Sequence, residues 1–236
     1  MSELSPRVAV VVFPGSQDDR DAAWALAAVG AEPVMVWHAE PTLPARVSAV
    51  VLPGGFSYGD YLRCGAIARF APAMRAVTAF AQDGGLVLGI CNGFQILCEA
   101  GLLPGALRPN ASLRFVCRDG VVEVETSATP FTVRCRPGQR LTIPVKHGEG
   151  CYFAPPNLLE EIEASGQVVL RYADGDNPNG SLAGIAGVMN ATGNVMGLMP
   201  HPEHAVDPLL GSGDGALILA SLVETAGDRA LADTGR

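Results

Sequence analysis

Short apolar runs alternate with segments of helical spacing through the first hundred residues. Four of these runs have the length of buried strands, at 7–13, 32–37, 47–52 and 86–88. Between them, helices are expected over 21–29 and roughly 65–82, and a further helix should end at Gly101. This strand–helix rhythm predicts right-handed βαβ units on a parallel sheet.

The pattern changes after Pro104, where short strand-like runs follow one another with turn residues between them. We therefore expect an α/β fold with an open, mostly parallel central sheet flanked by helices and an inserted antiparallel strand region. No repeat, low-complexity tract or linker divides the chain, which predicts a single domain over 1–226 and a loose polar tail, 227–236. The later expected strands are 113–117, 121–125, 132–135, 140–145, 168–172, 185–189 and 195–199, with helices over 155–165 and 215–226.

Composition narrows the function classes. The chain has 236 residues, 48% of them apolar, so it can bury a substantial core. A formal net charge of −8 without a basic cluster disfavours nucleic-acid binding. No run resembles a signal peptide or a membrane span. Six cysteines without Cys-x-x-Cys spacing predict reduced thiols in a cytoplasmic protein, and four scattered histidines predict no metal site.

The stretch around Cys91 combines a strand, a sharp turn and a helix. An apolar run leads into Gly89-Ile90-Cys91-Asn92-Gly93, and a helical pattern follows through Phe94 and Leu97. The glycines would let the strand and helix backbones pass close together, as in a nucleophile elbow. Cys91 would then stand exposed at the apex, with the first amides of the helix aimed at whatever the sulfur attacks. The alternative is a small buried cysteine in a tight turn.

A histidine and a glutamate near the C-terminus complete a candidate triad. His201-Pro202-Glu203 directly follows an apolar strand, and Pro202 restricts the backbone between the two polar side chains. The Glu203 carboxylate would fix the tautomer of His201, whose other nitrogen would face Cys91. The alternatives are a loop histidine without a catalytic role and His204 as the base.

A glycine-rich segment, 53–61, comes straight off the third expected strand. Ligands of open parallel sheets bind at the carboxyl ends of strands, and glycines there would bring backbone N–H groups close to a substrate. The segment is not a phosphate loop, because no Gly-Lys-Ser/Thr closes it. A plain turn is the alternative.

Together these motifs resemble the class I, or triad, glutamine amidotransferases. The elbow 89–95 and His201-Pro202-Glu203 carry that resemblance. More narrowly, segments 54–66, 143–150 and 177–181 resemble the glutaminase subunits of phosphoribosylformylglycinamidine synthase. The resemblance covers roughly residues 8–222 and implies a flavodoxin-like fold. The polar tail departs from it without touching the motifs.

The resemblance implies a role for each motif residue. Cys91 would attack the side-chain amide of glutamine, His201 would transfer the proton to the leaving ammonia and later activate water, and Glu203 would hold His201. A γ-glutamyl thioester would form and be hydrolysed to glutamate. The N–H groups of Gly55 and Asn92 would stabilise the oxyanion. The residues implied in holding the substrate are Gly54, Gln95, His147 and Gly148.

Partners follow from the same resemblance. Ammonia would pass to a large synthetase subunit, joined by a small bridging subunit, that converts formylglycinamide ribonucleotide (FGAR) to formylglycinamidine ribonucleotide (FGAM) in purine synthesis. This chain has no phosphate loop, so it should bind no cofactor, and ATP and Mg should bind the partner.

Two other functions stay open. One is a stand-alone cysteine hydrolase of γ-glutamyl or peptide bonds, and the other is a silent scaffold, against which the intact triad argues. The sequence does not assign roles to Tyr58, Asp60 and Arg63.

Overall fold

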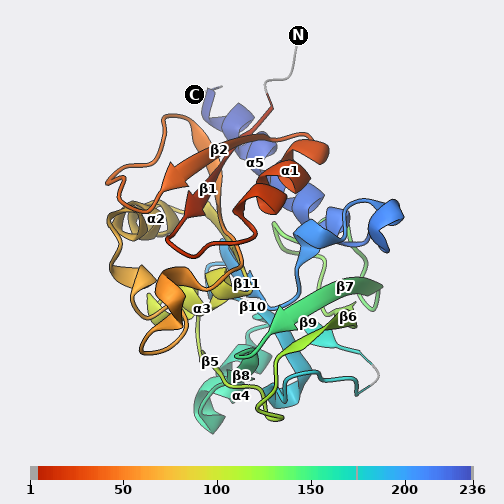
Figure 1. The fold of residues 1–236 in the computed structure, drawn as a ribbon. Helices are drawn as coiled ribbons and strands as arrows, with labels where there is room; N and C mark the ends of the chain where they lie inside the picture. The colour runs from red at the N-terminus through yellow and green to blue at the C-terminus, as the bar shows by residue number, and fades with distance from the viewer. Residues whose placement is uncertain (1–4, 174, 235–236) are drawn as a thin grey trace.

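The computed structural model describes residues 5–173 and 175–234. Nine strands of this part of the chain form one continuous sheet (Figure 1). Their order across the sheet is β2 (Glu32–Trp37), β1 (Arg7–Val12), β3 (Val47–Leu52), β4 (Leu86–Ile90), β11 (Val195–Leu198), β10 (Ile185–Met189), β9 (Val168–Tyr172), β6 (Val116–Val124) and β7 (Arg140–His147).

The sheet has a parallel half and an antiparallel half. Strands β2, β1, β3, β4 and β11 pair in parallel, whereas β11, β10, β9, β6 and β7 pair antiparallel. The continuous apolar runs of β1, β3 and β4 are buried in the core, as expected of parallel strands covered on both faces. The predicted fold class is therefore confirmed, and the inserted strands extend the central sheet.

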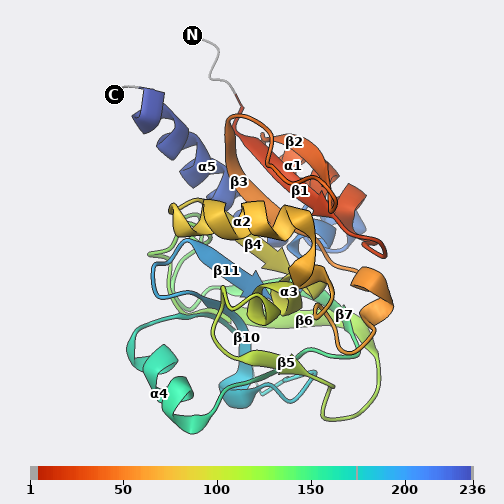
Figure 2. The same cartoon turned by 90° about the vertical axis from the view of Figure 1, so that its left-hand side faces the viewer.

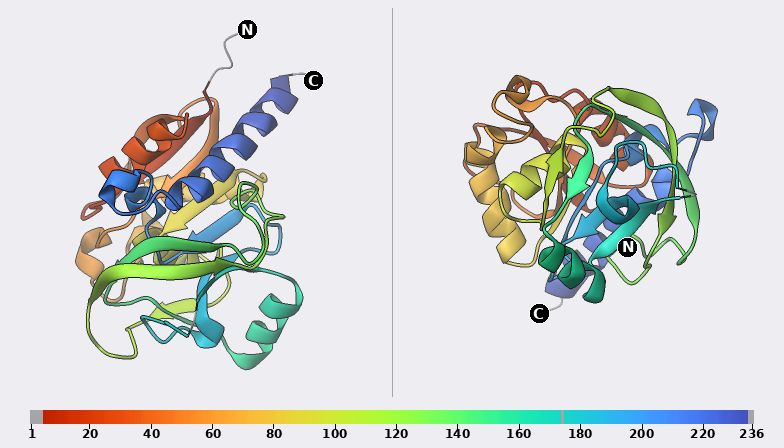
Figure 3. Two further views of the ribbon diagram at one scale, coloured as in Figure 1. Left: turned by 90° about the vertical axis from the view of Figure 1, so that its right-hand side faces the viewer. Right: turned by 90° about the horizontal axis from the view of Figure 1, so that it is seen from below.

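Helices cover both faces of the parallel half. Helices α1 (Asp19–Ala28) and α5 (Gly215–Thr234) pack against each other on one face, and α2 (Pro72–Gln82) and α3 (Asn92–Glu99) lie on the other (Figures 2 and 3). Helix α4 (Pro156–Ala164) lies beyond the antiparallel half, near the small sheet of β5 (Ala106–Arg108) and β8 (Cys151–Phe153). Within residues 5–173 and 175–234, no helix is long and apolar enough to cross a membrane.

Two segments of the predicted pattern are wrong. Residues 132–135 form turns instead of a strand, because the Thr132 hydroxyl bonds the Thr126 carbonyl at 2.8 Å and competes with strand pairing. The helix expected over 65–82 begins only at Pro72. Proline forces the preceding Ala71 into an extended backbone, ψ 144°, and Pro72 then occupies the first helical turn. The strands expected at 113–117 and 121–125 are one strand, β6.

The closing helix is longer than predicted. The segment expected to be a loose polar tail, 227–236, is helical as far as Thr234, and residues 235–236 lie outside the described residues. Alanine, leucine and arginine in this segment are good helix formers. Arg229 also donates a hydrogen bond to the Gly84 carbonyl at 2.8 Å, which ties the extension to the body of the protein. The single-domain boundary at 226 stays a prediction.

The fold gathers several loops at one edge of the sheet. β1, β3, β4 and β11 are neighbours, so the loops at their carboxyl ends lie side by side. The sheet curls so that its far edge strand, β7, returns to the same place, where the His201 amide donates to the Pro144 carbonyl at 2.8 Å. This edge therefore receives residues from both halves of the sheet.

Close backbone packing at the elbow requires the two glycines flanking Cys91. A Cβ atom at Gly93 would lie 2.0 Å from the Leu52 carbonyl oxygen, and one at Gly89 would lie 2.7 Å from the backbone of Gly93. Strand β3, strand β4 and helix α3 thus meet without room for a side chain. The close approach predicted from the glycine spacing is confirmed.

We expect Gly93→Ala to lower the free energy of unfolding by about 3 kcal/mol, the upper end of the usual cost of overpacking. The reason is the collision of the new methyl group with the Leu52 carbonyl. Urea denaturation measures the loss. Gly120→Ala in β6 is the control, because its Cβ would lie 3.5 Å from the Ile143 oxygen, an ordinary contact. Equal losses in the two variants would contradict this account.

Candidate active site

Cys91 occupies a strained turn between β4 and α3. Its backbone angles are φ 50° and ψ −103°, a conformation that a non-glycine residue adopts only where the surroundings enforce it. This is the sharp turn predicted for a nucleophile elbow. The side chain, however, is only 5% exposed, so the thiol is not freely exposed at the apex as expected. A substrate must reach it through a pocket.

That pocket, of about 300 Å³, lies at the carboxyl edge of the sheet. It brings together six predicted site residues from four separate segments: Gly55, Cys91, Gln95, His147, Gly148 and His201. The other side chains and backbone groups that line it are those of Gln17, Asp18, Phe56, Asp60, Cys64, Phe115, Cys117, Lys146 and Glu149. Three predicted residues, Gly54, Asn92 and Glu203, do not line it.

His201 and Glu203 form a buried pair behind the pocket. Nδ1 of His201 lies 2.6 Å from Oε1 of Glu203. His201 directly precedes the short helix η4 (Pro202–His204), which contains Glu203. Burial by itself lowers the pKa of His201, but the negative charges of Glu203 and Cys91 outweigh it and raise that pKa above its usual value. Nε2 is buried and has no hydrogen-bond partner among the described residues, which leaves it available for proton transfer.

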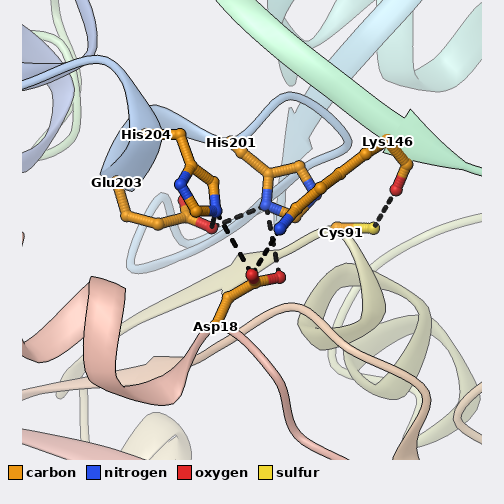
Figure 4. A network of polar contacts seen from close by, with 6 residues as sticks. All are labelled: Asp18, Cys91, Lys146, His201, Glu203 and His204. Carbon is orange, nitrogen blue, oxygen red and sulfur yellow. Dashed lines mark hydrogen bonds and ion pairs between the residues drawn. The ribbon is translucent and has the colours of Figure 1, made fainter. Parts of the chain in front are cut away.

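The thiol of Cys91 lies between the histidine loop and strand β7. Its Sγ donates to the Lys146 carbonyl at 3.8 Å (Figure 4). The imidazole of His201, held by Glu203, is also close enough for the charge of Cys91 to act on its pKa. A cysteine beside a cationic histidine is the arrangement that favours a reactive thiolate.

The two candidate oxyanion donors belong to segments that are joined to each other. Gly55 has φ +143°, and a Cβ there would lie 2.6 Å from the Gly15 oxygen, so only glycine fits. Asn92 begins α3, and its Oδ1 accepts from the Ser57 amide at 3.2 Å. The elbow and the segment 53–61 are therefore held in register, although the oxyanion role of both amides stays a prediction.

The segment 57–65 has an unusual backbone. Tyr58, Asp60 and Leu62 all have positive φ, near 54°, 54° and 72°. Tyr58 is braced by a 2.6 Å hydrogen bond to Nδ1 of His38, and the guanidinium of Arg63 bonds Glu99 at 2.6 Å. Tyr58 and Arg63 thus fix the segment, while Asp60 lines the pocket.

The side chain of His147 anchors the loop 146–150 through contacts with two asparagines. Its Nδ1 lies 3.2 Å from Oδ1 of Asn110, and its Nε2 lies 3.4 Å from Nδ2 of Asn179. Asn110 donates its Nδ2 to two carbonyls, and Asn179 donates its own to Tyr172, which fixes the orientation of both amides. These partners select the neutral Nδ1–H tautomer, and burial together with the charge of His201 lowers the pKa of His147 to about 4.

Gln95 joins the same loop to the elbow helix. Its Oε1 accepts from Nδ2 of Asn92 at 2.9 Å, and its Nε2 donates to the Glu149 carbonyl at 2.5 Å. The polar atoms of Gln95 and His147 are thus engaged with the protein, although both side chains line the pocket. Their predicted substrate contacts remain untested. The observed contacts give both residues a part in shaping the loop that surrounds the pocket.

Sequence reasoning missed Asp18. Asp18 stands at the N-cap of α1, but its side chain makes no capping hydrogen bond. The carboxylate instead bonds Nζ of Lys146 and lies 3.2 Å from Nε2 of His204. Burial alone raises the pKa of Asp18, but the hydrogen bond from His204 and the charges of His201 and Lys146 hold it well below its usual range. The one feature of the sequence that could have pointed to Asp18 is its place in the loop that follows strand β1.

A metal ion would find suitable donors in the same place. Atoms of Asp18, His201, Glu203 and His204 lie within 4.8 Å of one another. Lys146 already supplies a positive charge to Asp18, and Nδ1 of His201 already bonds Glu203. We therefore interpret the cluster as a polar network whose charges are compensated by protein groups.

Comparison with known proteins identifies the family. Residues 5–212 match the CobB/CobQ-like glutamine amidotransferase domain. The chain belongs to this family of glutamine amidotransferases. Phosphoribosylformylglycinamidine synthase subunit PurQ of Rubrobacter xylanophilus is 61% identical over 93% of this chain and 99% of its own. The subunit of the same name from Salinibacter ruber is 57% identical over 93% and 97%. A chain in the structure of PurLQS from Thermotoga maritima is 45% identical, with a TM-score of 0.86 over 93% of this chain and 98% of that chain.

The neutral state of His147 makes a pH-dependent contribution to stability. In the unfolded chain, His147 binds a proton below its ordinary pKa of about 6.5. In the folded chain it binds a proton only below about pH 4. Stability should therefore fall as the pH drops through this window, by roughly 2–3 kcal/mol from this residue. His147→Gln, which does not titrate, should flatten the dependence. Urea denaturation at pH 7 and pH 4.5 measures both slopes, and equal slopes would contradict the assignment.

Proposed function

We propose that this chain is the glutaminase subunit of phosphoribosylformylglycinamidine synthase in de novo purine biosynthesis. It hydrolyses glutamine and delivers the ammonia to a synthetase subunit that converts FGAR to FGAM with ATP. The observation that carries the proposal is the meeting of a strained elbow cysteine, Cys91, with the buried His201–Glu203 pair at one pocket. The high identity to PurQ subunits and the similarity to a chain of PurLQS support it.

The reaction starts at the sulfur. The Cys91 thiolate attacks the side-chain amide carbon of glutamine, and the carbonyl oxygen becomes an oxyanion. The amides of Gly55 and Asn92 donate to that oxygen, an interaction worth about 3 kcal/mol for a single donor at such sites. The imidazolium of His201 gives its proton to the nitrogen, the C–N bond breaks, and ammonia leaves a γ-glutamyl thioester on Cys91.

The second half of the reaction uses the same groups in reverse. His201, now neutral, takes a proton from water, and the hydroxide attacks the thioester carbon. The C–S bond breaks, glutamate leaves, and the thiolate–imidazolium pair is restored. Glu203 keeps Nδ1 of His201 engaged throughout, so that Nε2 is the nitrogen that exchanges protons.

The remaining components belong to other chains. ATP and Mg bind the large synthetase subunit, and a small third subunit bridges the two larger ones. This chain binds glutamine and needs no cofactor for the steps above. Its six free cysteines fit a reducing cytoplasm. A stand-alone cysteine hydrolase is not favoured, because the relatives with high identity are named as synthase subunits.

Removal of the sulfur tests the mechanism. Cys91→Ala should lower glutamate release by about a thousandfold or more, since no other group can form the thioester. The assay uses the complex with the synthetase subunit, FGAR and ATP. Cys98→Ala is the control, because Cys98 lies on the same helix outside the pocket. Unchanged turnover in Cys91→Ala would overturn the mechanism. Labelling of Cys64 or Cys98 by a glutamine-like electrophile would overturn the assignment of the nucleophile.

The partner should activate the chain. Glutamine hydrolysis by the chain alone is expected to be weak and to rise roughly tenfold or more in the complex, the scale of typical coupling between sites. The strained, positive-φ backbone at Tyr58, Asp60 and Leu62 lies next to the candidate oxyanion loop, so we expect the partner to act on the site there. Steady-state glutamate release with and without the partner measures the effect. Equal turnover in both states would exclude coupling.

A further inference from the structure

We propose that Asp18 is a positioning residue of the glutaminase site, a second carboxylate that acts on His201 beside Glu203. The inference rests on the proposed function, because it concerns the same reaction. Asp18 comes from the loop after β1, far from the motifs that carry Cys91 and His201. Its side chain is 3% exposed and turns into the site (Figure 4).

The carboxylates of Asp18 and Glu203 face the same nitrogen of His201. Oε1 of Glu203 lies 2.6 Å from Nδ1, and Oδ2 of Asp18 lies 3.6 Å from it. Glu203 therefore takes the hydrogen bond, and Asp18 acts through its charge. Negative charge near Nδ1 favours the imidazolium that forms when His201 holds the proton of Cys91.

The two oxygens of Asp18 have different surroundings. Oδ2 faces His201, whereas Oδ1 accepts from Nζ of Lys146 and lies 3.2 Å from Nε2 of His204. Nε2 of His204 also lies 3.7 Å from Glu203. Two buried carboxylates side by side would repel each other without such partners. Lys146 and His204 thus allow Asp18 to stay ionised next to Glu203.

Gly54 keeps the space between Asp18 and His201 open. A Cβ atom at this position would collide with Oδ2 of Asp18 and would lie 2.6 Å from Cε1 of His201. The absence of a side chain at Gly54 is therefore what lets the carboxylate approach the imidazole. We predicted Gly54 as a substrate-binding residue, and this contact gives it a second reason to be glycine.

Lys146 connects Asp18 to the nucleophile as well. Its ammonium bonds Asp18, and its carbonyl accepts from Sγ of Cys91 at 3.8 Å. The ion pair joins the β1 loop to strand β7, across 128 residues of sequence. Asp18 therefore acts on both members of the catalytic pair, by charge on His201 and through Lys146 on the position of the thiol.

Asp18→Asn tests the charge while preserving the shape of the side chain. In the complex with the synthetase subunit, kcat for glutamine hydrolysis should fall about 10- to 100-fold, and KM should change less than about threefold, because Asp18 acts through His201 and not on the substrate. Loss of the charge lowers the pKa of His201. The alkaline limb of the kcat/KM profile should therefore move to lower pH, by about one unit.

The pH profile also depends on the other groups that face His201. They are Cys91, Glu203, Lys146, His147 and His204. None of these side chains is replaced in Asp18→Asn, and Glu203 keeps its contact with Nδ1 of His201, so a moved alkaline limb reports the missing charge. Asp21→Asn is the matched control, because Asp21 is an exposed carboxylate on the first turn of the same helix. It should keep the activity and pH profile of the wild type.

A second pair of variants covers the case in which a buried unpaired group prevents folding. Lys146→Met should lower the melting temperature, because it leaves Asp18 without its cation. Adding Asp18→Asn to Lys146→Met should restore the melting temperature and leave kcat no lower than in Asp18→Asn alone, since Lys146 serves to keep Asp18 ionised and in place.

Alkylation of Cys91 by iodoacetamide gives a readout that does not need glutamine turnover. The inflection of its rate profile that belongs to His201 should move to lower pH in Asp18→Asn, as the alkaline limb does. An unmoved inflection, or a loss of stability alone, would overturn the role of Asp18. A wild-type complex that alkylates normally but releases no glutamate would refute the proposed function, and the alkylation profiles would then decide the role of Asp18 by themselves.

Discussion

The close packing of three backbone segments at the elbow determines where every other group of the site must lie. Gly93 rests against the carbonyl of Leu52, and Gly89 rests against Gly93, so β3, β4 and α3 have one way to meet. β4 is paired in parallel on both sides, with β3 and β11, and this buried pairing holds Cys91 in its positive-φ conformation. The sulfur is thereby fixed relative to the loops that end both neighbouring strands.

Charge pairing is the second constraint, and it acts between distant segments. Burying a carboxylate costs free energy unless opposite charges and hydrogen bonds offset the lost hydration. Glu203 is offset by His201, and Asp18 by Lys146 and His204. These pairs join the β1 loop, strand β7 and the loop after β11, so the charged groups around His201 also connect the segments that line the pocket.

The candidate triad could be recognised in the sequence because its members lie in short motifs with a physical signature. Glycines around Cys91 and a proline between His201 and Glu203 restrict the backbone locally, and those restrictions are visible in the sequence. Several errors arose where a contact outside the segment decided the outcome. The Thr132 hydroxyl bonds the Thr126 carbonyl, and the resulting turn takes the place of strand pairing. The segment after residue 226 stays helical, and Arg229 in it bonds the Gly84 carbonyl. His147 lines the pocket, and the partners that hold it, Asn110 and Asn179, come from other loops.

The elbow and its surroundings show which features of the site depend on local sequence and which depend on tertiary structure. The sequence by itself determined the alternation of strands and helices, the turn at Cys91 and the polar groups placed after strand ends, because each depends on the conformational preferences of neighbouring residues. Only the tertiary structure decided that Asp18 and Lys146 lie beside the candidate triad, since they are 128 residues apart and meet where the far edge strand, β7, returns to the site. The electrostatic potential at His201 is the sum of contributions from groups that only the fold brings together, so no local sequence pattern encodes it.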